Sequence, residues 1–246
     1  MAEWVRLILA NGSYNGKPVI KPDALAPVFV PLMTRGKAPV SGAESFYGLG
    51  WSVRFSRYGL EWIHAGAFTD GARTLVDLLP DQHLGIVVLS NAFPTGVPEA
   101  VAETFFDLVL SDQPPKDWLP LWNGGFKSLF EPAIAAAKAT YGKPPAGVTP
   151  ALSLSAYAGT YANPYVGDAV FAEANGQLEV RLGPNGKTVR PLTPFNRDVF
   201  VYYPYVETPD LPVPITFRIG ADGKANEVFI ENLNDVGFGT LKRVKE

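Results

Sequence analysis

The residue with the clearest capacity for chemistry is His64, one of two histidines in this 246-residue chain. It follows the mostly apolar run at residues 60–63, which is typical of a strand, and it precedes Ala65, Gly66 and Ala67. A glycine in a strand lets another chain approach the backbone closely. An imidazole beside an open backbone N–H can donate a hydrogen bond or relay a proton near a developing oxyanion. The alternative is a histidine satisfied by a backbone group. His83, in a polar turn, is predicted to be solvated.

The composition excludes several other kinds of site. The chain has no cysteine, so disulfide scaffolds, thiolate zinc sites and cysteine nucleophiles are excluded. No phosphate-binding glycine loop, His-Glu-x-x-His motif or EF-hand loop is present, and we expect no metal and no cofactor. The net charge of -3 disfavours nucleic-acid binding, which needs a basic surplus. No apolar run reaches the ~20 residues that a membrane-spanning helix requires.

Patterning predicts that residues 1–111 combine an antiparallel sheet with flanking helices, an α+β arrangement. Helical spacing is seen at residues 2–10, and proline and aspartate at residues 22–23 indicate a short second helix. Turn signals separate strand-like runs and indicate an antiparallel meander: residues 46–55, 60–64, 72–79 and 84–90. Residues 97–110 are predicted to form a helix with one apolar face: Val101, Phe105, Leu108 and Val109.

The remaining sequence changes character twice. Residues 112–149 are punctuated by proline and glycine, and we interpret them as an interdomain linker with a helix at residues 128–140. Residues 150–246 show an all-β pattern of about eight short strands, several joined by Asn-Gly or Asp-Gly turns. This pattern favours a closed or nearly closed antiparallel barrel, with a sandwich as the alternative. The aromatic residues between 200 and 205 are predicted to pack in its core rather than to line a ligand cavity.

Residues 1–111 resemble the closing half of the serine β-lactamase-like fold, which includes class C β-lactamases, penicillin-binding D,D-peptidases and related esterases. The resemblance is carried by these runs, in this order: Tyr47-Gly48-Leu49-Gly50-Trp51, His64-Ala65-Gly66, Gly71 and Leu84-Gly85-Ile86-Val87-Val88-Leu89-Ser90-Asn91. The run Tyr157-Ala158-Gly159-Thr160-Tyr161 and the closing run Gly239-Thr240-Leu241 resemble the lipocalin-like domain often appended to these hydrolases.

The resemblance implies a catalytic site around His64. His64-Ala65-Gly66 matches the His-x-Gly form of the family's third motif, on the strand that edges the active site. His64 is therefore expected to face the substrate cleft, and the Ala67 N–H to be one of two oxyanion-hole donors. Gly66 would allow the close approach, and Ala65 and Phe68 are expected to contact substrate.

Two other motifs of that family are missing or misplaced. No serine in the chain has a lysine three places on, so the Ser-x-x-Lys motif that holds the nucleophile is absent. The run Tyr161-Ala162-Asn163 matches the family's Tyr-x-Asn motif, but it lies in the β-rich region and is interpreted as turn chemistry. We interpret the chain as the C-terminal portion of a longer hydrolase, whose N-terminal portion supplies the nucleophile. Alone, the chain is expected to be inactive or nearly so.

The leading hypothesis is therefore acyl-serine hydrolysis of an ester, amide or β-lactam in the intact protein. The alternative is a non-catalytic module that binds a small ligand or a protein through its C-terminal barrel. A third hypothesis is a complementing subunit, completed by a separate chain. A truncated sheet would leave apolar area exposed, so we expect association with the missing portion or with a second copy. The resemblance suggests a periplasmic or secreted protein, and the chain shows no signal peptide.

Overall fold

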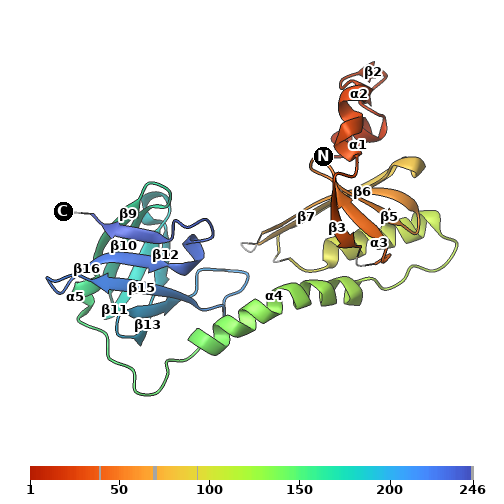
Figure 1. The fold of residues 1–246 in the computed structure, drawn as a ribbon. Coiled ribbons are helices and arrows are strands. Elements are labelled where there is room, and N and C mark those ends of the chain that lie inside the picture. The colour runs from red at the N-terminus through yellow and green to blue at the C-terminus, as the bar shows by residue number, and fades with distance from the viewer. Residues whose placement is uncertain (39, 69–70, 93, 245–246) are drawn as a thin grey trace. The chain divides into compact units, whose positions relative to one another are not determined.

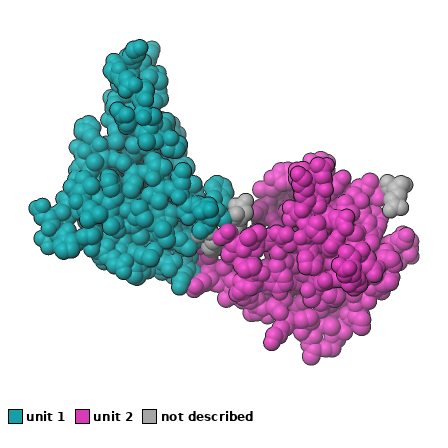
Figure 2. Space-filling model, turned by 180° about the vertical axis from the view of Figure 1, so that it is seen from behind, with its two compact units in different colours: residues 1–129 teal, residues 130–246 magenta. Residues whose placement is uncertain are grey.

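The computed structural model describes the chain except residues 39, 69–70, 93 and 245–246 (Figure 1). The chain forms two compact units, Met1–Leu129 and Phe130–Glu246 (Figure 2). Each unit is built around its own antiparallel sheet, and helices accompany both sheets. The expected α+β class is confirmed, as is a barrel-like sheet in the second unit.

The first unit contains a six-stranded antiparallel sheet in the order β3-β4-β5-β6-β7-β8, beside a small β1-β2 hairpin. The strands of the main sheet are β3 Met33–Lys37, β4 Glu44–Tyr47, β5 Ser52–Ser56, β6 Gly59–Phe68, β7 Ala72–Leu79 and β8 Leu84–Ser90. The other elements are α1 Ala2–Leu9, β1 Ser13–Tyr14, β2 Lys17–Pro18, α2 Pro22–Leu25, the 3-10 turns Ala26–Phe29 and Pro80–Gln82, and α3 Val97–Leu110.

The single strand predicted at residues 46–55 is wrong, because the chain turns back within it. Gly50 adopts a φ of +87°, and the Gly48 N–H donates to the Trp51 carbonyl at 2.7 Å. This tight turn separates β4 from β5, which then pair with each other. The run at residues 60–64 also continues further than predicted, since β6 extends to Phe68.

The two faces of the sheet are covered by different helices. On one face, α1 packs Val5 and Ile8 against Val76 and Leu78 of β7. On the other face, Ala102 of α3 packs with Leu75 of β7. Residues 75 and 76 alternate between these faces, as side chains along a strand must. The apolar strand β8 ends the sheet, and its Leu89 side chain is 68% exposed.

Helix α3 is rotated relative to the face predicted from its apolar residues. Val101, Leu108 and Val109 are exposed, whereas Phe106 is buried. Its buried face also carries three acidic residues: Glu99, Glu103 and Asp107. The helix therefore packs through a mixed apolar and acidic face, which requires basic partners on the sheet.

The next helix, α4, spans Leu119–Tyr141 and is longer than the helix predicted at residues 128–140. None of its described side chains is fully buried, although Trp122 and Phe126 are partly covered. Helix propensity favours the alanine-rich end of the run, whereas Gly124 and Gly125 disfavour its start. Pro132 also lies inside the helix and removes one backbone donor.

The second unit is a nearly closed nine-stranded sheet with the order β12-β11-β10-β9-β17-β16-β15-β14-β13. Its strands are β9 Gly159–Asn163, β10 Gly167–Ala174, β11 Gln177–Leu182, β12 Thr188–Pro191, β13 Thr193–Asn196, β14 Val199–Tyr202, β15 Val213–Ile219, β16 Ala225–Ile230 and β17 Thr240–Arg243. Short helical pieces are α5 Leu154–Tyr157 and the 3-10 turns Pro184–Gly186 and Glu231–Leu233. Strand β13 was not predicted, because Pro194 disfavours a strand interior.

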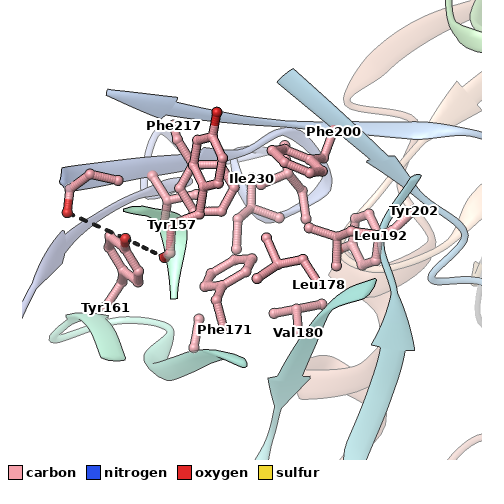
Figure 3. Close-up of a cluster of buried hydrophobic side chains, with 14 of the residues drawn as sticks. Tyr157, Tyr161, Phe171, Leu178, Val180, Leu192, Phe200, Tyr202, Phe217 and Ile230 are labelled. Atoms are coloured by element: carbon pink, nitrogen blue, oxygen red, sulfur yellow. Dashed lines mark hydrogen bonds between the residues drawn. The ribbon is translucent and has the colours of Figure 1, made fainter. Parts of the chain in front are cut away.

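Aromatic side chains fill the centre of this barrel (Figure 3). Tyr157, Phe171 and Phe200 are almost fully buried and surround Phe217. The Phe171 and Phe200 rings meet Phe217 edge-on at centroid distances of 4.9 Å and 5.7 Å, an arrangement that aromatic pairs favour. Phe200 and Tyr202 are core residues, as predicted, while Tyr203 is 38% exposed.

Candidate active site

The end of β6 has a free edge in the described structure. Strand β5 pairs with β6 only as far as Ser52, which lies opposite Ile63, while β6 continues beside β7 to Phe68. The Gly66 N–H donates to Thr74 Oγ1 at 3.2 Å, and the Gly66 carbonyl accepts from Arg73 Nη1 at 3.0 Å, so Gly66 is directed toward β7. Backbone groups alternate between the two edges of a strand. The N–H groups of Ala65 and Ala67 therefore point to the free edge.

His64 lies at the start of this free segment. Its side chain is exposed, and Nδ1 contacts the Gly50 carbonyl oxygen. A carbonyl oxygen only accepts hydrogen bonds, so Nδ1 carries the hydrogen and Nε2 is the nitrogen available to a ligand. The ring also meets Trp51 edge-on, with centroids 6.5 Å apart.

Trp51 supports His64 and is not part of the cleft. It is 5% exposed and stacks on Trp4, with centroids 5.4 Å apart and planes 9° from parallel. The turn that ends β4 thus supplies both the ring beside His64 and the carbonyl that orients it. Its burial makes Trp51 a packing residue.

A cavity of about 850 Å³ opens beside the free edge of β6. His64, Ala65 and Ala67 line it, whereas Gly66 and Phe68 are not among its lining residues. Phe68 is 56% exposed, and a Cβ on Gly66 would lie 2.9 Å from Thr74 Oγ1 and 3.1 Å from Phe68 Cε2. A side chain at position 66 would therefore crowd Thr74 and Phe68. The structure brings together three of the five residues that the sequence singled out.

The cavity also contains charged residues that sequence reasoning did not identify. Arg35 and Lys37 of β3 are exposed at its rim, and the Arg35 guanidinium donates to Ser52 Oγ at 2.8 Å. Its interior carries both signs of charge: Arg54, Arg73, Asp77, Glu99 and Glu103. The signal in the sequence was charge on one face of β7, at residues 73 and 77, and at i, i+4 positions of α3, at residues 99, 103 and 107.

The interior charges form ion pairs within the sheet and between the sheet and α3. Arg73 pairs with Glu99, and Arg54 donates to the two carboxylate oxygens of Glu61 at 2.5 Å and 3.0 Å. Burial, together with the charge of Glu61, raises the pKa of Asp77 well above its ordinary value. The same two causes raise the pKa of the Glu103 carboxyl.

Asp107, near the C-terminal end of α3, accepts hydrogen bonds from several elements. One carboxylate oxygen accepts from Tyr58 Oη at 2.6 Å and contacts Arg57, and the other accepts from Trp118 Nε1 at 2.7 Å and Lys116 N at 3.2 Å. Burial acts to raise the pKa of Asp107, but these hydrogen bonds outweigh it and hold the pKa below its ordinary value. The carboxylate thus forms hydrogen bonds with both the β5–β6 turn and the segment that follows α3.

The Tyr-x-Asn run in the second unit has a structural role. The Tyr161 hydroxyl donates to the Tyr157 carbonyl at 2.7 Å and accepts from Arg243 Nη2 at 2.7 Å. Burial raises the pKa of Tyr161 to about 12, although Arg243 opposes the shift. Asn163 Oδ1 accepts from the N–H groups of Tyr165 at 3.0 Å and Val166 at 2.7 Å, which is the geometry of an Asx turn.

The described part of the chain holds neither a metal-binding cluster nor a membrane-spanning helix. Among the described residues, no group of three or more histidine, cysteine or acidic side chains is arranged to hold a metal ion. The described helices also include none that is long and apolar enough to cross a membrane.

Comparison with known proteins gives one family match, in the second unit. Residues 143–240 match the model of a domain of unknown function, DUF3471. No curated protein matches the chain. The chain is similar to the solved structure titled "Crystal structure of C-terminal domain of penicillin binding protein Rv0907". That similarity has 29% sequence identity and a TM-score of 0.36, and it covers 41% of this chain and 93% of the other. A TM-score this low establishes no common fold.

Proposed function

We propose that the first unit forms the cleft edge of a serine hydrolase of the β-lactamase, D,D-peptidase or esterase type. The observation that carries this proposal is the free backbone edge at Ala67, open to the same cavity as His64. Residues 1–111 would belong to the hydrolase domain, residues 112–149 to a linker and residues 150–246 to an appended barrel. The nucleophile is supplied by polypeptide outside these 246 residues, because the chain contains no Ser-x-x-Lys.

The proposed reaction uses the β6 edge to stabilise charge. A serine hydroxyl attacks the carbonyl carbon of an ester, amide or β-lactam and transfers its proton to a general base on its own segment. The oxygen of the tetrahedral intermediate accepts hydrogen bonds from the Ala67 N–H and from the nucleophile's own N–H. The leaving group departs with a proton, and water then hydrolyses the acyl-serine to a free acid.

His64 contributes a positioned imidazole at the cleft. Because Nδ1 is held by the Gly50 carbonyl, Nε2 faces the ligand side as an acceptor when the ring is neutral and as a donor when it is protonated. It can therefore hydrogen-bond a polar group of the substrate or pass a proton to the leaving group.

The experiment combines the chain with a polypeptide that carries the Ser-x-x-Lys segment. We expect hydrolysis of an acyl substrate by the mixture and no labelling of the 246-residue chain alone by a serine-directed phosphonate. Ala67→Pro removes the proposed donor, while the backbone groups paired with β7 belong to neighbouring residues. This variant should lower kcat by about 10²- to 10³-fold, whereas Ala67→Gly, which keeps the N–H, should retain most activity. Labelling of the chain alone would refute the proposal.

The barrel alternative has less support. A small-ligand binder of the lipocalin-like type would need an open interior, but the barrel centre is filled by its own aromatic side chains (Figure 3). A protein-binding role for the outer surface of the barrel remains the second candidate. The exposed Tyr165 and Phe238 rings favour it, since they stack on the surface with centroids 4.8 Å apart.

A further inference from the structure

The interior of the cavity contains buried polar atoms without a hydrogen-bond partner among the described residues. They are Asp77 Oδ1, Glu99 Oε2 and Arg73 Nε, on side chains of residues that are 3%, 5% and 8% exposed, respectively. All three residues line the same cavity. Buried polar groups in proteins are nearly always hydrogen-bonded, so unpartnered atoms on residues that line a cavity point to a missing partner.

Carboxyl groups outnumber guanidinium groups around Asp77, and the Asp77 carboxyl is hydrogen-bonded to Glu61. It faces Glu61 from β6, Arg54 from β5 and Glu103 from α3, and its neighbour on β8 is the apolar Ile86. Arg54 uses two nitrogens to bind Glu61, and its distance to Glu103 is 4.0 Å. Arg57 pairs with Glu103 at 3.3 Å and also with Asp107. Two guanidinium groups therefore face four carboxyl groups, those of Glu61, Asp77, Glu103 and Asp107. Buried carboxylates need a paired cation or a bound proton, and the protein supplies too few cations here.

The rest of the lining is suited to an apolar stem beside a charged head. Leu75 lies on the same strand face as Asp77, and α4 contributes Trp122, Phe126 and Leu129 to the cavity. The Phe126 ring already faces one cation, with Arg73 Cζ 5.0 Å from its centroid. Aromatic faces attract cations electrostatically, and a cavity of about 850 Å³ accommodates a small organic molecule.

We propose that this cavity is a binding site for an organic cation, an ammonium or guanidinium group on an apolar stem. The charged head donates a hydrogen bond to Asp77 Oδ1, and the stem lies along Leu75 and the α4 side chains. The site needs no nucleophile, so the inference does not rest on the proposed hydrolase function.

Binding of the cation competes with binding of a proton. Burial and the charge of Glu61 raise the pKa of Asp77, so the empty site holds a proton below that pKa. A cation favours the ionised carboxylate, and its binding releases the proton. Affinity should therefore increase as the pH rises through the pKa of Asp77. The pKa of Glu103 is also raised, so loss of its proton should increase affinity in the same direction of pH.

The test is calorimetric titration of the full chain with n-butylammonium. The titration is repeated at pH values on both sides of neutrality and in two buffers with different ionisation enthalpies. The expected result is saturable binding with proton release and with higher affinity at the higher pH. n-Butanol, with the same stem and no charge, should bind at least about tenfold more weakly. Equal binding of butanol, or the absence of butylammonium binding, would overturn the proposal.

Two variants locate the site. Asp77→Asn should weaken butylammonium binding by about tenfold or more and reduce the proton release. Glu131→Gln, which removes an exposed carboxylate from α4, is the matched control and should change neither. An equal loss in both variants would show general attraction to a negative surface and would refute the site. If Asp77→Asn fails to fold, the comparison of butylammonium with butanol on the unaltered chain decides the question.

Discussion

At the residue scale, position 66 shows how a motif residue can be required by packing. The glycine of His64-Ala65-Gly66 was predicted to admit a substrate, yet its crowding comes from Thr74 and Phe68. Gly66→Ala should lower the free energy of unfolding by about 1–3 kcal/mol because the added Cβ overlaps these side chains. Chemical denaturation measures this loss.

The matched control is Gly124→Ala in α4, where a Cβ would have no neighbour within 4 Å. A helical alanine in open space is expected to stabilise the chain by about 0.5–1 kcal/mol. If both variants lose the same stability, the loss at position 66 does not come from crowding.

Asp107 gives a second prediction at this scale. Asp107→Asn removes the charge that faces Arg57 and places an amide against other donors, so we expect a loss of about 2–3 kcal/mol. The pKa of Asp107 is lowered in the folded state, so its contribution exists above the unfolded pKa and is lost as the pH falls through the folded pKa. Urea denaturation from neutral to acidic pH should show a smaller acid sensitivity in the variant. An unchanged acid dependence would contradict this role.

At the scale of elements, the carboxyl groups between α3 and β7 should give the free energy of unfolding a pH dependence opposite to that of Asp107. Asp77 and Glu103 have raised pKa values, so the folded state binds protons more tightly than the unfolded state. Their contribution to stability is therefore greatest below the ordinary carboxyl pKa of about 4 and decreases as the pH rises through the folded values. Asp77→Asn should be more stable than the parent chain at alkaline pH and should show a smaller fall in stability on going from acidic to alkaline pH. Equal slopes for both proteins would contradict the assignment.

The orientation of α3 can be tested by paired substitutions. Phe106→Ala should cost about 3–5 kcal/mol, because the side chain is 1% exposed. Leu108→Lys should change stability by less than about 0.5 kcal/mol, because that side chain is 65% exposed. A large loss in the second variant would indicate that the face predicted from the sequence is the buried one.

The same helix shows what the sequence can and cannot predict. Its bounds follow from local pattern, and so do those of β7 and β8. Its buried acidic face does not, because the partners of Asp107 and Glu99 include Arg57 and Arg73, which are distant in sequence and are brought close only by the sheet. His64 and Ala67 were identified through a motif, whereas Asp77 lay in a strand where no local signal gave its partners.

At the scale of the whole molecule, two separate cores predict two unfolding events. The Met1–Leu129 unit and the Phe130–Glu246 unit have distinct hydrophobic clusters. We expect calorimetry to show two transitions, with the fragment 130–246 reproducing one of them. Tyr161→Phe, which removes a hydroxyl bound to the Tyr157 carbonyl and Arg243, should lower only that transition. A single transition that shifts as a whole would show that the units unfold together.

The outer edge of β8 has a consequence for the chain in concentrated solution. Its run Leu84–Ser90 contains no charge and no proline, the two devices that usually stop strands of different molecules from joining. Light scattering should therefore reveal growth of assemblies with concentration, and Leu89→Lys should suppress it while Leu108→Lys, also at an exposed leucine, should not. The strand that completes the sheet on one side can thus pair with a strand of a second molecule, and covering this edge should limit self-association.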